Sequence, residues 1–247
     1  MTAIFKREMR SYFTTPTGYV FLAVFLSVCG FAFSMSTLVA GTESNVATYF
    51  VYCVFIYAVV VPILTMKLFS EDRKNGTEQV YLTSPTSITG IVMGKFLAAE
   101  AMFCIALFLN SLNFLLLFKY AEIPAYGSTA FFDLQPLELI IGNIFGMLFL
   151  GTAFIALGTF ISSLTESQIS AAIVTVFCTA ALSASSFVTE YINTEWLRLG
   201  IKWFCVLDRL VGLVNGLLEL NTFLYFISFV AVFLFLTVRV YERRRWA

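Results

Sequence analysis

Few residues of this sequence have the types and spacing that chemistry requires. The run Gly90-x-x-x-Gly94-Lys95-Phe96 has the outline of a loop that holds nucleotide phosphates with backbone N–H groups and a lysine. It is one residue too short between the glycines, and a phenylalanine stands where a Ser or Thr would bind magnesium. The sequence also has no histidine, the commonest general base and metal ligand. We therefore expect no catalytic residue, metal site or cofactor on this chain.

Glu100 is the one acidic residue that the sequence places inside a predicted membrane span. A carboxylate in hydrocarbon is costly, so such a residue suggests a function, for example in a substrate pathway. We favour a structural role near the membrane edge or in a bond to another helix, because a lone acid is a poor proton relay. Asn110 and Asn113 lie one turn apart on the same span and are expected to bond to other helices, with a pathway role as the alternative.

The longest polar stretch between two apolar runs covers residues 70–95. The Asn-Gly pair at 75–76 tolerates the positive φ of a tight turn, and Thr77 can cap a helix that follows it. That helix would end before Pro85, because the residue preceding a proline is displaced from the α region. Ser87 can then cap the helix that enters the membrane. A short helix held between two turns suits the transmission of a push from a soluble partner into the bilayer.

The composition places the chain among membrane proteins. Of its 247 residues, 60% are hydrophobic and 12% are charged, whereas a soluble protein has about 25% charged residues. The 15 basic residues balance the 15 acidic ones, so no overall field attracts nucleic acid. We expect a single all-α polytopic membrane domain over residues 1–247.

Six long apolar runs predict six transmembrane helices, since each contains the roughly 18–20 residues that cross the hydrocarbon layer. Residues 11–42 carry no charge. This is longer than the apolar region of a signal peptide, which has about 7–15 residues, so the first run is interpreted as an uncleaved span. Pro62 is expected to kink the second span, with a neighbouring helix satisfying the carbonyl that it frees. The predicted spans are residues 19–40, 46–68, 88–118, 138–161, 167–189 and 220–240.

The Lys and Arg residues predict the orientation of these spans. With both termini in the cytoplasm, eleven basic residues lie inside and four outside, and the segment 70–95 faces the cytoplasm, where ATP is available. The inner set is Lys6, Arg7, Arg10, Lys67, Arg73, Lys74, Lys95, Arg239, Arg243, Arg244 and Arg245; the outer set is Lys119, Arg198, Lys202 and Arg209.

Three further segments complete the predicted architecture. Residues 1–17 carry apolar side chains at helical spacing beside three basic ones, which predicts a helix lying in the membrane interface. Residues 162–168 form a tight turn between the fourth and fifth spans. Residues 190–219 mix tryptophans and charges with Leu and Val, and are too charged to span. They predict external re-entrant or interfacial helices between the fifth and sixth spans. In the fourth span, glycines at 142, 146, 151 and 158 favour close helix packing.

Three motifs resemble those of type-2 ABC transporter permeases. Arg73-x-x-Gly76-Thr77-Glu78, Leu82-Thr83-Ser84-Pro85 and Gly94-Lys95-Phe96 are similar to the family's segment between the second and third spans, which includes its coupling helix. The opening Lys6-Arg7-Glu8-x-x-Arg10-Ser11-Tyr12-Phe13-x-x-Pro16 is similar to its N-terminal interfacial helix, and the closing Tyr241-Glu242-Arg243-Arg244-Arg245-Trp246 also fits. The resemblance covers essentially the whole chain and is closest to gliding-motility-associated permeases.

The resemblance implies the permease subunit of an ABC exporter in a bacterial inner membrane. Two permease chains, identical or different, would pair with two cytoplasmic ATPase subunits that bind ATP and magnesium. A periplasmic accessory protein is a further partner that the family allows. The residues expected to dock on the ATPase are Glu71, Asp72, Arg73, Gly76, Thr77, Glu78, Leu82 and Pro85. A smaller second contact is expected at Thr165, Glu166 and Gln168.

Three alternatives remain open at this point. The chain could transmit force from an ATPase to an external partner without conducting a substrate, as the gliding-motility resemblance allows. A secondary transporter or channel usually shows several intramembrane charges or paired broken helices, and the sequence has few such features. A membrane-embedded enzyme is disfavoured by the lack of histidine and of paired intramembrane acids. The apolar spans lean toward a hydrophobic, lipid-linked or polymeric cargo.

Overall fold

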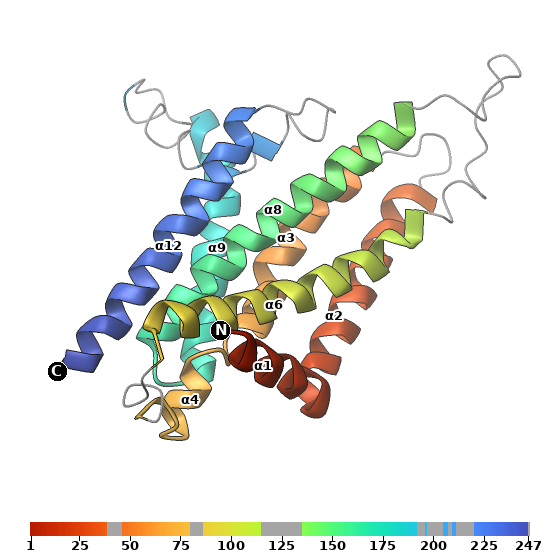
Figure 1. Cartoon of the computed structure of the whole chain (residues 1–247). Helices are drawn as coiled ribbons and strands as arrows, with labels where there is room; N and C mark the ends of the chain where they lie inside the picture. The colour runs from red at the N-terminus through yellow and green to blue at the C-terminus, as the bar shows by residue number, and fades with distance from the viewer. Residues whose placement is uncertain are drawn as a thin grey trace, which may run out of the picture.

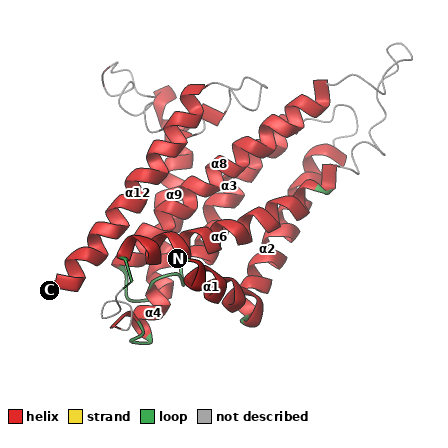
Figure 2. Ribbon diagram, viewed as in Figure 1, coloured by secondary structure: helices red, strands yellow, loops and turns green. Residues whose placement is uncertain are grey.

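The described part of the chain is a bundle of helices without a β-strand, which confirms the all-α class (Figures 1 and 2). The computed structural model describes residues 1–38, 46–79, 86–114, 135–191, 196, 205–206, 209–210 and 220–246. Its helices are α1 (Thr2–Thr14), α2 (Pro16–Phe33) with a π-helical end (Ser34–Leu38), α3 (Val46–Thr65), α4 (Ser70–Lys74), α6 (Ile88–Ser111), α8 (Gln135–Leu164), α9 (Gln168–Tyr191) and α12 (Leu220–Trp246).

Within the described residues, six helices are long and apolar enough to cross a membrane, as predicted. They are α2, α3 with its extension through α4, α6, α8, α9 and α12. Most boundaries differ from the predicted ones by a few residues, but α6 ends at Ser111, seven residues before the predicted end of the third span at residue 118. The first span begins at Pro16 rather than residue 19, and α8 continues to Leu164 rather than ending at residue 161. α12 extends through its basic end to Trp246.

Part of the predicted architecture falls outside the described residues. Between Tyr191 and Leu220, only five isolated positions are described. The external re-entrant segment predicted at 190–219 therefore stays a prediction. The same holds for the interfacial location of α1, although α1 is confirmed as a separate helix.

α1 and α2 meet at a corner where the sequence breaks the helix. Thr15 has an extended backbone (φ −94°, ψ 151°), and Pro16 begins α2, where its missing N–H costs no hydrogen bond. Beyond the corner, α1 lies across the start of α6 (Figure 1). Gly94 of α6 permits this approach, since a Cβ at that position would come within 3.2 Å of Ile4.

Aromatic side chains fill the interior between α2, α3 and α6. Tyr57 and Phe103 pack edge to face with ring centroids 5.4 Å apart, and both contact Phe25. Nearer the other end of α2, Phe33 packs edge to face on Tyr49, also at 5.4 Å. All five rings are at most 2% exposed. Such pairs contribute about 0.5–1.5 kcal/mol each beyond their burial, so this half of the bundle is firmly packed.

Pro62 lies inside α3, as the sequence predicted, and the carbonyl that it frees has a partner on another helix. Proline has no N–H, so Ala58, four residues earlier, loses its intrahelical hydrogen bond. The hydroxyl of Thr179 on α9 donates to the Ala58 oxygen at 2.7 Å. This bond fixes α9 against α3 at the proline.

Two glycines of α8 lie where other helices approach most closely. A Cβ on Gly151 would overlap the ring of Phe103 on α6, and a Cβ on Gly158 would overlap the side chain of Thr65 on α3. This confirms that glycines of the fourth span allow close packing. Gly30 on α2 is different, because a Cβ there would meet no atom within 4 Å.

We predict that Gly158→Ala destabilises the protein, whereas Gly30→Ala does not. Both changes add one methyl group to a helical glycine, so they share any gain in helix propensity. Only the first overpacks the α3–α8 contact, at an expected cost of about 1–3 kcal/mol. Thermal unfolding in detergent measures the difference. Equal melting temperatures for the two variants would contradict the α3–α8 packing.

Candidate functional site at the α4 end of the bundle

The segment that follows α3 forms a short helix and a tight turn at one end of the bundle. After a turn at 66–69, α4 covers Ser70–Lys74, a helix that the sequence did not predict. Gly76 then has φ +70°, which confirms the predicted turn, because L side chains rarely adopt this conformation. The hydroxyl of Thr77 donates back to Asp72 Oδ1 at 2.8 Å and closes the turn onto α4. Residues 78 and 79 are helical directly after Thr77, where the sequence predicted a helix to begin, and its continuation from residue 80 lies outside the described residues.

The N-terminus of α4 is held by a side chain from another span. Ser162, near the end of α8, accepts hydrogen bonds from the backbone N–H groups of Phe69 at 3.1 Å and Ser70 at 3.3 Å. Its own hydroxyl donates to the carbonyl of Met66 at 3.2 Å. A helix N-terminus leaves its first N–H groups without intrahelical partners, so this serine supplies a cap from a distant part of the chain.

Lys95 is the centre of the site. Its side chain is 2% exposed, and its Nζ lies 3.1 Å from Glu8 Oε1 on α1 and 2.6 Å from Asp72 Oδ2 on α4. The ammonium also donates to the carbonyl of Leu68 at 2.5 Å and lies 5.2 Å from the ring centroid of Phe69. Three segments far apart in the sequence therefore meet on one cation of α6.

The charges of this cluster are balanced. Arg7 lies 2.5 Å from Glu8 and 3.8 Å from Asp72, so two cations face two carboxylates. We call the four residues Arg7, Glu8, Asp72 and Lys95 the Lys95 cluster. Glu8 and Asp72 are themselves 9% and 15% exposed. A buried charge with its partner removed costs several kcal/mol, so each member depends on the others.

A second buried lysine holds the α1–α2 corner beside this cluster. Lys67 donates to Thr17 Oγ1 at 2.7 Å and to Thr15 Oγ1 at 3.2 Å, and its Nζ lies 4.4 Å from the ring centroid of Tyr12. Tyr12 in turn donates to the carbonyl of Leu64 at 3.3 Å. Burial, reinforced by the charge of Glu8, raises the pKa of Tyr12 well above its ordinary value, so the phenol keeps the proton that it donates.

Two further ion pairs tie the segment to the rest of the bundle. Arg73 pairs with Glu166 in the turn between α8 and α9, at 2.5 Å. Glu78 pairs with Arg244 near the end of α12, at 3.0 Å, with side chains 12% and 25% exposed. The N-terminus of α1 and the C-terminus of α12 thus lie at the same end of the bundle as α4 (Figure 1). An even number of spans requires this arrangement.

Some of the predicted docking residues contact other parts of the chain, and others are exposed. Asp72, Arg73 and Glu78 are engaged in contacts within the chain, and Glu71 is half-buried. The exposed tip consists of Lys74, Asn75, Gly76 and Thr77. Leu82 and Pro85 lie outside the described residues.

The two predicted contact regions are brought together. Glu166 lies against Arg73, while Thr165 donates to the carbonyl of Ile161 at 3.1 Å and Gln168 begins α9. The structure also confirms Ser87 as the cap of α6, since its hydroxyl oxygen accepts from the Gly90 N–H at 3.3 Å.

Sequence reasoning missed Lys95, Glu8, Ser162 and Arg244 as members of the site. One signal was available for Lys95, because a cation in the apolar run after Ile88 must find an acceptor. Nothing in the spacing pointed to Glu8, Ser162 or Arg244, which come from three other helices.

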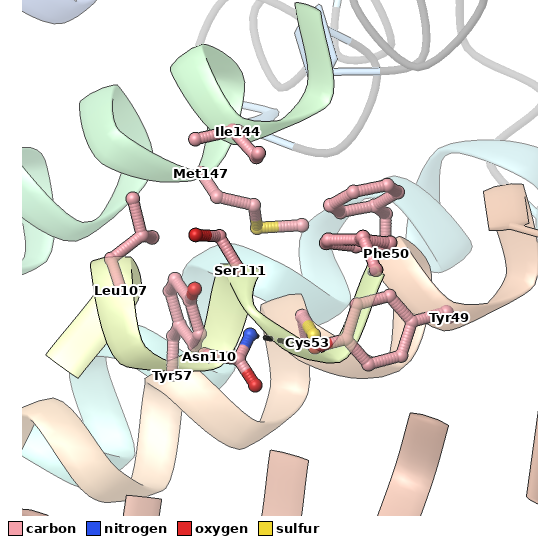
Figure 3. Close-up of a pocket in the computed structure, with 10 residues that line it drawn as sticks. Tyr49, Phe50, Cys53, Tyr57, Leu107, Asn110, Ser111, Ile144 and Met147 are labelled. Carbon is pink, nitrogen blue, oxygen red and sulfur yellow. Dashed lines mark hydrogen bonds between the residues drawn. The ribbon is translucent and has the colours of Figure 1, made fainter. Parts of the chain in front are cut away.

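The residues proposed for a pathway do not form one site. Asn110 is 5% exposed and donates to the Tyr49 hydroxyl at 2.8 Å (Figure 3). Asn113 donates to Asn110 Oδ1 at 3.2 Å. Asn110 borders a cavity of about 10 Å³, at the lower limit for one water molecule. The expected bond to another helix is therefore present for Asn110. Glu100 lies ten residues earlier on α6 and bonds to Thr152 of α8 instead.

We predict that Lys95→Met destabilises the protein by about 3–5 kcal/mol, because Glu8 and Asp72 lose their buried partner. Adding Glu8→Gln and Asp72→Asn to this variant removes the uncompensated charges and should restore much of the loss. Lys74→Met on the exposed face of α4 is the matched control and should have little effect. Thermal unfolding in detergent is the measurement. A Lys95→Met variant as stable as Lys74→Met would refute the cluster.

Similarity to known proteins does not assign this site. No protein-family model matches the sequence, and no curated protein matches it.

Proposed function

We propose that this chain is the membrane-spanning subunit of an ABC exporter and that residues 70–79 receive the stroke of a separate ATPase. The proposal joins two supports. One is the resemblance of the sequence to type-2 ABC permeases. The other is the way in which residues 70–79 are tied to the bundle. The membrane would be a bacterial inner membrane with both chain ends in the cytoplasm, as the distribution of Lys and Arg favours.

The observation that carries the proposal is the number of helices that this short segment engages. Asp72 joins it to α6 and α1 through Lys95 and Arg7. Arg73 joins it to the α8–α9 turn, and Glu78 joins it to α12. α3 leads directly into it. A displacement of α4 cannot occur without moving or breaking these contacts, which are the connections a coupling element needs.

The same contacts divide the segment into two parts with different roles. The inner part, with Asp72, Arg73 and Glu78, transmits motion within the chain. The outer tip, Lys74 to Thr77, is exposed and forms the docking surface for the ATPase. This division changes the expectation for Asp72, Arg73 and Glu78, which act as anchors in this proposal rather than as direct contacts.

The transmitted motion would enter the membrane through α6. Lys95 lies about two turns inside this helix, and one face of the helix packs on α8 while its start supports α1. A pull on Asp72 therefore acts on α6 and α1 together. ATP and magnesium would be bound by the ATPase, and a second permease chain would complete the assembly.

The test is recovery of an ATP-hydrolysing protein with the tagged chain, purified in mild detergent from membranes of its own host. We predict that Lys74→Glu lowers the recovered ATPase activity by about tenfold, because a reversed charge at a docking surface costs more than about 1.4 kcal/mol. Lys6→Glu, an equal reversal on the exposed face of α1, is the matched control and should retain the ATPase.

Two outcomes would count against the proposal. Recovery of no ATPase with the unmodified chain would remove the ABC assignment altogether. Equal recovery with Lys74→Glu and the unmodified chain would remove the tip as the docking surface while leaving the assignment standing.

A further inference from the structure

Glu100 and Thr152 form an isolated polar contact between α6 and α8. The hydroxyl oxygen of Thr152 lies 2.7 Å from Glu100 Oε1 and also 2.7 Å from the carbonyl oxygen of Leu148. The second oxygen of the acid, Oε2, is buried and has no hydrogen-bond partner among the described residues. The contact lies within a helix that is long and apolar enough to cross a membrane.

If Glu100 were ionised, this contact would contain one hydroxyl proton for two acceptor oxygens. Thr152 has one hydroxyl proton, while two acceptor oxygens lie at the same short distance from it. A threonine inside a helix commonly donates to the carbonyl four residues earlier, which here is Leu148. With that bond made, an ionised Glu100 would place a bare carboxylate oxygen 2.7 Å from a hydroxyl lone pair. A proton on Glu100 removes the conflict.

Thr179 has the same arrangement of one hydroxyl proton and two acceptors, but neither of its acceptors is an acid. Its hydroxyl also has two acceptors at 2.7 Å, the carbonyls of Ala58 and Thr175. Neither amide carbonyl takes up a proton at ordinary pH, so Thr179 must share its one proton between them. A carboxylic acid can supply a proton of its own, and the contact of Thr152 can therefore be satisfied without sharing.

Among the described residues, none forms an ion pair with Glu100. On α6, Lys95 is held by Glu8 and Asp72, and the other neighbour is the thiol of Cys104. The remaining helices packed on α6 bring few ionisable groups. α8 has none between 142 and 164, α12 has only Tyr225 between 221 and 238, and α2 has Tyr19 and Cys29. α3, which contacts α6 through Tyr57 and Tyr49, has the neutral groups Tyr49, Tyr52, Cys53 and Tyr57. α1 has Lys6, Arg7, Glu8, Arg10 and Tyr12, near the start of α6. A carboxylate without a partner is costly in hydrocarbon, whereas a neutral acid is much less so.

We propose that Glu100 is a proton-binding site within the membrane. Its ligand is a proton, carried on Oε1 at neutral pH. Glu100 Oε1–H donates to Thr152, and Thr152 donates to the carbonyl of Leu148. Each of the two protons in this pair of hydrogen bonds then has one acceptor. The oxygen without a partner, Oε2, is the carbonyl oxygen of the protonated acid.

Proton binding at Glu100 stabilises the contact between α6 and α8. Release of the proton leaves a negative charge with no partner and one hydroxyl proton between two acceptors. The ionised side chain must then leave Thr152 for water or for a cation. Protonation of Glu100 is thus linked to the position of α6 against α8. This link does not depend on what docks on α4.

The proton is tested by infrared spectroscopy of the full-length protein in lipid bilayers at neutral pH. The difference spectrum between unmodified protein and Glu100→Gln should show the loss of one carbonyl band of a protonated carboxylic acid, with a shift in heavy water. Gln keeps an N–H donor toward Thr152, so the fold is retained. Thr152→Val should keep the band but shift it, because the acid loses its acceptor. If the unmodified protein and Glu100→Gln show the same protonated-acid bands, the proposal is overturned.

A chemical probe gives an independent readout. A hydrophobic carbodiimide reacts with a protonated acid, whose O–H adds across one C=N bond to give an O-acylisourea that rearranges to a stable N-acylurea. Mass spectrometry should find this adduct on Glu100 at neutral pH, decreasing as the pH rises, and none on Glu8 or Asp72. Equal labelling of all three carboxylates would contradict a proton held selectively at Glu100.

Discussion

The structure depends on one buried cation finding enough acceptors. Lys95 is 2% exposed on a largely apolar helix, and its charge would be prohibitive there without partners. It is satisfied by Glu8, Asp72 and the carbonyl of Leu68, which come from α1, α4 and the end of the α3 region. No single helix could supply these acceptors. The lysine therefore determines which segments meet at this end of the bundle.

Such a cluster specifies an arrangement more than it adds stability. Replacing a buried ion pair by well-packed apolar side chains is often neutral or stabilising, whereas removing one partner is costly. The packing of α2, α3, α6 and α8 already holds the membrane bundle through aromatic rings and close glycine contacts. The Lys95 cluster instead gives a polar loop and an N-terminal helix one defined position on that bundle. A coupling element needs this property, because a stroke applied to a loose loop would be lost.

Local signals in the sequence predicted the local features. Hydrophobic runs gave six spans within a few residues, the Asn-Gly pair gave the turn at Gly76, and Ser87 was recognised as a helix cap. Long-range partners had no such signal. Ser162 caps α4 from 92 residues away, and Arg244 pairs with Glu78 across 166 residues. Periodicity and turn chemistry report on neighbours within about one or two helical turns, so they could not show that the predicted docking charges point inward.

If Lys95 holds α4 and α1 in place together, amide hydrogen exchange in lipid nanodiscs will detect that the two helices open together. Segments that share a stabilising cluster open as one unit and exchange with a common free energy. We expect the amides of α4 and the amides of α1 around Glu8 to be protected, and the free energies of opening measured for the two helices to be equal. Exchange of the α4 amides near the rate of an unstructured chain, while α1 stays protected, would contradict it.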